Sequence, residues 1–157
     1  MKLTSDSLDD GGTIAMELVF DGCGGTNQSP QLSWTGAPAG TKSFAITCFD
    51  PDAPTGCGYW HWLAFDIPAS VTSIKAGAGT KASPAGGRSG YTDFGISSYG
   101  GPCPPKGDGA HRYIFTVYAL DVDSIKGASD KTTGAMLTFM MRGHVLATGR
   151  RTGHFGH

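Results

Sequence analysis

Two stretches of the chain combine histidine with carboxylate, proline and glycine residues in a way that could do chemistry. The first runs from Asp50 to Trp62 and reads DPDAPTGCGYWHW, so that two carboxylates precede a histidine flanked by two tryptophans. The second, residues 104–113, reads PPKGDGAHRY and ends in a histidine and a nearby tyrosine. Proline restricts its own backbone and that of the preceding residue, so both loops should be stiff. The pattern predicts two rigid loops that bring polar groups into a small anion pocket.

The positions of these side chains along strands indicate which of them share a face. Side chains alternate between the two faces of a strand, so His111 and Tyr113 should lie together while Arg112 points outward. An imidazole and a phenol side by side can both donate hydrogen bonds to an oxyanion. The same alternation predicts that Trp60 and Trp62 face away from the histidine between them.

The residue types leave three kinds of site open. A metal site is not expected, because the two histidines are 50 positions apart and show no metal-ligand spacing. Catalysis would need a carboxylate to orient a histidine as a base, and no GxSxG nucleophile motif is present. Anion binding would use protonated histidine and backbone amides. A plainer interpretation is that Asp50 and Asp52 only form the turn.

Composition limits the function further. A chain of 157 residues favours one domain, residues 1–157. The net charge of −1 excludes the concentrated basic surface needed for nucleic acid. No apolar run reaches the roughly 18 residues of a transmembrane helix, and the polar first residues do not resemble a secretory signal. We therefore expect no membrane segment and a cytoplasmic location.

The four cysteines show no CxxC spacing, which argues against a zinc ribbon. In a reducing cytoplasm all four should be free thiols, with Cys48 buried in a strand. Cys57 and Cys103 lie in the two motif loops and could approach each other in the fold. The sequence leaves the redox state of these two residues open.

Strand patterns dominate the rest of the chain. Runs of β-branched and aromatic residues, or alternation of polar and apolar residues, predict strands over 14–20, 31–34, 43–49, 59–67 and 111–120. A late helix should be capped by Ser129 or Asp130 and end at Gly149. Its apolar positions, which should pack on the core, are Met136, Phe139, Met140, His144, Leu146 and Ala147. Residues 150–157 could add an edge strand. The order predicts a mainly β protein, an antiparallel sandwich or barrel with one C-terminal helix.

The two motifs resemble the signature regions of the phosphatidylethanolamine-binding protein family, and most closely its bacterial and archaeal Raf-kinase-inhibitor-like branch. The likeness is carried by DPDAP at 50–54, WHW at 60–62, PPKG at 104–107 and HRY at 111–113, with weaker matches elsewhere. It implies an antiparallel Greek-key β-sandwich with a small pocket. The short, glycine-rich tail after the helix departs from the longer helical end of eukaryotic members and implies a more open pocket.

The resemblance also implies a function. Family pockets bind phosphate-like groups, acetate and phospholipid headgroups, without a cofactor or metal. By motif position the ligand-binding residues would be Asp50, Asp52, Pro54, His61, Cys103, Pro104, His111 and Tyr113. We expect a regulatory binding protein more than an enzyme. The alternatives are an inhibitor of a protease or kinase that acts through a surface near the pocket, and an esterase-like or phosphatase-like hydrolase. Dimers are common among prokaryotic members, so a homodimer is also expected.

Overall fold

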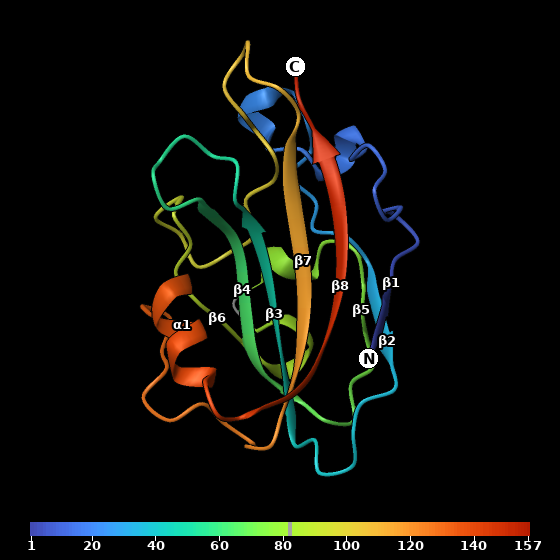
Figure 1. Ribbon diagram of the computed structural model, residues 1–157, viewed down its shortest axis with the longest axis vertical. Helices are drawn as coiled ribbons and strands as arrows, with labels where there is room; N and C mark the ends of the chain where they lie inside the picture. The colour runs from blue at the N-terminus through green and yellow to red at the C-terminus, as the bar shows by residue number, and fades with distance from the viewer. Residues whose placement is uncertain (82) are drawn as a thin grey trace.

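The computed structural model describes residues 1–81 and 83–157, which form two antiparallel sheets and one α-helix (Figure 1). The smaller sheet has the order β1-β2-β5, with β1 at Lys2–Thr4, β2 at Leu32–Thr35 and β5 at Ser73–Ile74. The larger sheet has the order β6-β4-β3-β7-β8. Its strands are β3 (Ser43–Asp50), β4 (Tyr59–Pro68), β6 (Arg88–Ser89), β7 (His111–Leu120) and β8 (Val145–Phe155). The predicted mainly β fold is confirmed.

Four of the five predicted strands appear at their expected places, as β2, β3, β4 and β7. The strand predicted over 14–20 is wrong. That segment contains a 3-10 turn, η1 (Met16–Leu18), followed by η2 (Asp21–Cys23). The backbone hydrogen bond here is local, because the amide of Leu18 donates to the carbonyl of Ala15 within the turn. Leu18 and Val19 are nevertheless buried, so the apolar run reflects core packing without strand pairing. Two further 3-10 turns are η3 (Ala78–Thr80) and η4 (Pro84–Gly86).

Two apolar clusters lie on opposite faces of the larger sheet. One fills the space between the two sheets and includes Leu32 and Trp34 from the smaller sheet with Phe115 and Val117 from β7. The other lies between the larger sheet and the helix. The protein therefore has three layers, two sheets and a helix, and the sheet that carries both motifs is the middle one.

The helix, α1, spans Gly134–Met141 and is shorter than predicted. Thr133 caps it by accepting a hydrogen bond from the amide of Met136, so the caps expected at Ser129 or Asp130 are wrong. Residues 145–149, expected inside the helix, begin β8, whose pairing with β7 outweighs their helical pattern. The edge strand expected over 150–157 is therefore part of a longer strand.

The apolar face of α1 also differs from the prediction. Leu137 and Met141 are buried against the sheet, whereas Phe139 is 74% exposed and Met136 is 48% exposed. Gly134, the first residue of the helix, lies on the Trp60 ring, where an added Cβ would come within 2.2 Å of a ring carbon. Within the described residues, no helix has the length and apolar character needed to span a bilayer.

Candidate anion-binding pocket

A cavity of about 320 Å3 opens beside the end of β3 and the start of β7. Seven of the eight predicted site residues line it: Asp50, Pro54, His61, Cys103, Pro104, His111 and Tyr113. The eighth, Asp52, does not. The Asp52 carboxylate binds the side chain of Arg112 at 2.7 and 2.9 Å and the Arg112 amide at 2.9 Å. The hydrogen bond from Arg112 lowers the pKa of Asp52 to about 2, so Asp52 ties the first loop to β7 from outside the pocket.

Asp50 connects the two motif loops. Its Oδ1 accepts hydrogen bonds from the amides of Asp52 at 2.8 Å and Ala53 at 3.1 Å, which shapes the first loop as an Asx turn. Its Oδ2 lies 2.7 Å from Nδ1 of His111, and both side chains are buried. With three hydrogen bonds already made, the carboxylate serves to hold the imidazole in place.

His111 is stabilised in its charged form. Burial opposes the charge, but the hydrogen bond that His111 donates to Asp50, the negative charge of Asp50 and that of Asp108 outweigh burial and raise the pKa of His111. Because Asp50 occupies Nδ1, the other ring nitrogen, Nε2, is the one left for a ligand. Nε2 lies 3.4 Å from Oδ2 of Asp108 in the second motif loop.

His61 has the opposite character. Its Nδ1 lies 2.8 Å from the carbonyl oxygen of Gly100, so this nitrogen must carry a proton and donate it. Burial lowers the pKa of His61, although the Gly100 carbonyl and the charge of Asp50 act against the shift. The ring is therefore neutral at pH 7, and its Nε2 is left as a hydrogen-bond acceptor.

His61 reaches the pocket through a β-bulge. Along the β3–β4 pairing, Phe49 pairs with Trp60 and Cys48 pairs with Trp62, so β4 has one extra residue at His61. The extra residue changes the alternation of side chains. Trp60 packs on the helix side, while Trp62 joins the cluster between the sheets. The prediction that both tryptophans share the face opposite His61 is therefore wrong.

Tyr113 packs beside His61 on the floor of the pocket. Their rings meet edge to face, with centroids 5.0 Å apart, and Tyr113 is fully buried. Burial and then the charge of Asp50 raise the pKa of Tyr113, so its hydroxyl stays protonated and can donate to an oxyanion. Arg112 lies between His111 and Tyr113 on β7 and is exposed, as the alternation of side chains along the strand predicted.

Sequence reasoning missed the aromatic wall of the pocket. Phe20, Tyr59 and Phe94 line the cavity, and the rings of Phe20 and Phe94 stack with centroids 4.9 Å apart. Tyr59 could have been found, since it lies two positions before His61 in the same motif. Phe20 ends the segment wrongly predicted as a strand and Phe94 lies in a loop, so their convergence at the cavity depends on tertiary contacts.

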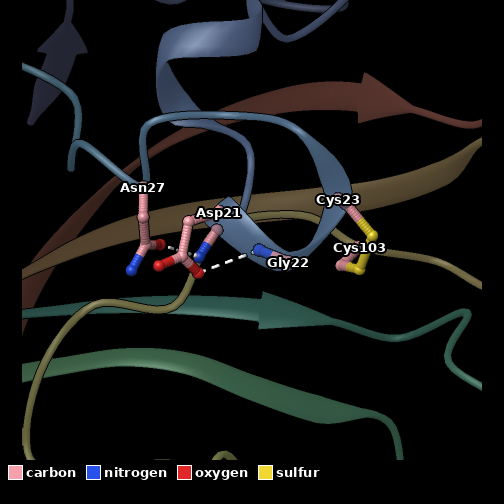
Figure 2. The surroundings of a disulfide bond; sticks show 6 residues. Asp21, Gly22, Cys23, Asn27 and Cys103 are labelled. Atoms are coloured by element: carbon pink, nitrogen blue, oxygen red, sulfur yellow. Dashed lines mark hydrogen bonds between the residues drawn. A yellow bond between two sulfur atoms is a disulfide. The ribbon is translucent and has the colours of Figure 1, made fainter.

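The expectation that all four cysteines are free is wrong. Cys23 and Cys103 form a disulfide between residues 80 positions apart, as Figure 2 shows. Cys103 is therefore not paired with Cys57, which is a free and exposed thiol, while Cys48 is free and buried. The disulfide joins the loop that carries Phe20 to the loop that carries Pro104, so it fixes two walls of the pocket relative to each other.

Backbone contacts reinforce this junction. The amide of Phe20 donates to the carbonyl of Pro102 at 3.1 Å, and the amide of Gly101 donates to Oδ1 of Asn27 at 2.8 Å. An added Cβ at Gly101 would come within 2.1 Å of the Leu18 carbonyl oxygen, so only glycine allows the two loops to approach this closely. Figure 2 shows Asn27 and the disulfide on either side of Asp21 and Gly22, so the two contacts hold the junction at separate points.

The polar groups of the pocket suit an anion better than a metal. Among residues 1–81 and 83–157, no group of three or more His, Cys, Asp or Glu side chains is arranged to hold a metal ion. The chemistry available at the floor is one imidazole whose charged form is favoured, one imidazole whose neutral form is favoured, and one phenol. A charged donor, an acceptor and a neutral donor can together hold a partly protonated oxyanion.

Comparisons with known proteins agree with this geometry. The family model described as phosphatidylethanolamine-binding protein matches residues 4–156. The UPF0098 protein YbhB of Escherichia coli is 46% identical over 159 residues, covering 99% of both chains. The crystal structure of E. coli YbcL, described as a new member of the mammalian PEBP family, matches with a TM-score of 0.95 and 42% identity, covering 99% of this chain and 98% of that one.

A more distant structure shares only the fold. A carboxypeptidase Y inhibitor, solved in complex with its cognate proteinase, matches with a TM-score of 0.55 and 20% identity, covering 91% of this chain and 75% of that one. The match to the family model and the identity to YbhB span almost the whole chain. The chain therefore belongs to the phosphatidylethanolamine-binding protein family.

Proposed function

We propose that this protein binds a small anion, either a free phosphate or carboxylate or the same group within a phospholipid headgroup, and acts through that binding. The observation that carries the proposal is the buried His111, whose Nδ1 is held by Asp50 and whose pKa is raised. A buried imidazole whose charged form is favoured, with its Nε2 not taken by Asp50, is a strong donor for an oxyanion, because charge-assisted hydrogen bonds are about twice as strong as neutral ones.

The other floor groups fit a phosphate that still carries a proton. Tyr113 can donate to a second oxygen, while the free Nε2 of neutral His61 can accept from a P–O–H group. Binding should therefore strengthen as the pH falls from about 8 to about 6, since a lower pH favours both the charged form of His111 and the protonated form of the phosphate. The wall of Phe20, Tyr59 and Phe94 would cover the organic part of a phosphate ester.

Calorimetric titration with inorganic phosphate tests the proposal. His111→Ala and His61→Ala should each weaken binding roughly 10- to 100-fold at pH 6.5, since each removes a buried hydrogen bond to the anion. His144→Ala is the matched control, because His144 is exposed and pairs with Asp121. Equal affinity in all four proteins, or binding that does not change between pH 8 and pH 6, would mean that the histidines are structural.

Inhibition of a protease or kinase, hydrolase activity and a homodimer stay predictions from the family resemblance. Among the described residues, the hydrogen bonds of the two pocket histidines go to the Gly100 carbonyl and to Asp50, and none joins either ring to a hydroxyl or thiol, so we favour binding over hydrolysis. The cytoplasmic location expected from the sequence also stays a prediction. The Cys23–Cys103 disulfide argues against it, because disulfides persist mainly in oxidising compartments.

A further inference from the structure

Asp108 lies beside the ring nitrogen of His111 that is left for a ligand, although it is not among the residues that line the cavity. Its Oδ2 is 3.4 Å from Nε2 of His111, the ring nitrogen that Asp50 leaves unused. The separation exceeds that of a good hydrogen bond, so the two groups form a loose ion pair in which Nε2 faces a carboxylate of the protein itself. An anion that approaches this nitrogen from the cavity must share it with Asp108 or replace it.

The two carboxylates beside His111 are held very differently. Asp50 is buried and accepts three hydrogen bonds. The side chain of Asp108 is 39% exposed, and in the described part of the chain its carboxylate has no hydrogen-bond or ion-pair partner besides His111. Asp50 is therefore a fixed part of the site, and Asp108 is attached to it by one weak contact.

The loop that carries Asp108 is built to move. One backbone hydrogen bond, from the amide of Asp108 to the carbonyl of Pro105 at 3.2 Å, closes its turn. Gly107 and Gly109 flank Asp108, and an added Cβ at either position would meet no atom within 4 Å. The loop extends past the ends of the strands beside the C-terminus (Figure 1). The open space at Gly107 and Gly109 means that displacing the tip of the turn would break few contacts there.

We propose that Asp108 is a built-in competitor for the ligand-facing nitrogen of His111, so that an anion binds only by displacing the Asp108 carboxylate. This inference rests on the proposed anion-binding function. It makes Asp108 a residue that determines selectivity, because only an anion that contacts the pocket floor more strongly than Asp108 contacts His111 can occupy the site. The other charged groups nearby, Asp52 and Arg112, neutralise each other outside the cavity.

The competitor has a second effect that the ligand must overcome. Once displaced, Asp108 remains on the same short loop, and its negative charge repels the bound anion at close range. Both effects lower the affinity, and removal of the charge should reverse both. A loose, partly exposed ion pair such as that of Asp108 with His111 has only a modest interaction energy. We therefore expect phosphate to bind roughly three- to tenfold more tightly to a variant that lacks the Asp108 charge.

The test compares Asp108→Asn and Asp108→Ala with the wild type by calorimetric titration with inorganic phosphate. Asp123→Asn is the control, since Asp123 is exposed beyond the far end of β7 and its replacement changes the net charge equally. The titrations are run at pH 6.0, because Asp108 helps to raise the pKa of His111 and the ring must stay charged in every variant. Tighter binding in both Asp108 variants, with Asp123→Asn unchanged, supports the inference.

Two outcomes overturn the inference and separate it from the proposed function. If the wild type binds phosphate and neither Asp108 variant binds more tightly, Asp108 is no competitor, while anion binding stands. If no variant binds phosphate, the proposed function fails and the inference fails with it. As a second readout, phosphate should shift the Gly107 and Gly109 amide signals in nuclear magnetic resonance spectra of the wild type. Unchanged glycine signals in a phosphate-bound protein would exclude displacement of the loop.

Discussion

Oδ2 of Asp50 lies 2.7 Å from Nδ1 of His111, although the two residues are 61 positions apart, and this contact joins the two motif loops at the pocket floor. The other carboxylate oxygen binds the amides of its own loop. One side chain thus sets the shape of the first loop and the orientation and charge of the histidine that begins β7.

Asp50→Asn should lower the pKa of His111, because the substitution removes the negative charge and the charge-assisted hydrogen bond that favour the imidazolium. It should also reduce the free energy of unfolding by about 1–3 kcal/mol, as expected when a buried, well-bonded acceptor is altered. A histidine titration by nuclear magnetic resonance and a urea unfolding curve measure the two effects. An unchanged His111 pKa would contradict the role given to Asp50.

The two pocket histidines should affect stability with opposite dependence on pH. The raised pKa of His111 means that its contribution is full below the unfolded value near 6.5 and is lost as the pH rises through its folded pKa. The lowered pKa of His61 means that its contribution is full above about 6.5 and is lost as the pH falls through its folded pKa.

Unfolding free energies of the wild type, His61→Gln and His111→Gln between pH 4 and pH 9 would separate these contributions. The difference between wild type and His61→Gln should shrink toward acid, and the difference for His111→Gln should shrink toward alkali. Two differences that change in the same direction would show that one of the assigned charge states is wrong.

Thiol counting tests the disulfide. With no reductant, one thiol, that of exposed Cys57, should react quickly in the folded protein, and buried Cys48 should react only after unfolding. Four thiols should appear after reduction. Cys23→Ser should lower the free energy of unfolding by about 4 kcal/mol, the chain-entropy value for a loop of 80 residues. Four reactive thiols in unreduced, unfolded protein would rule out the bond.

Gly134→Ala should destabilise the protein even though alanine is the better helix former by about 1 kcal/mol. The new Cβ would come within 2.2 Å of the Trp60 ring, and overpacking of this kind costs about 1–3 kcal/mol. Thermal unfolding measures the net loss. The cost should shrink in a Trp60→Leu background, where the ring is gone; an equal cost in both backgrounds would place its origin elsewhere.

The sequence predicted the strands that carry the site, and seven of the eight site residues it named line the cavity, because those residues stand at junctions between proline-rich loops and strongly patterned strands. It did not predict Phe20 or the Cys23–Cys103 pairing. Both depend on the close approach of two irregular loops, which leaves no periodic pattern. The predicted helix was too long because residues 145–149 pair with β7, and this pairing overrides their helical pattern.

The extra residue at His61 makes the site depend on the number of residues in β4 as well as on their types. Removing any one residue at the bulge would leave β4 able to pair with β3 in regular alternation. The histidine would then turn toward the helix layer, or lose its place to a neighbour. A single-codon deletion here would therefore disrupt the pocket through the direction of one side chain, without replacing any of the residues that form the two apolar clusters.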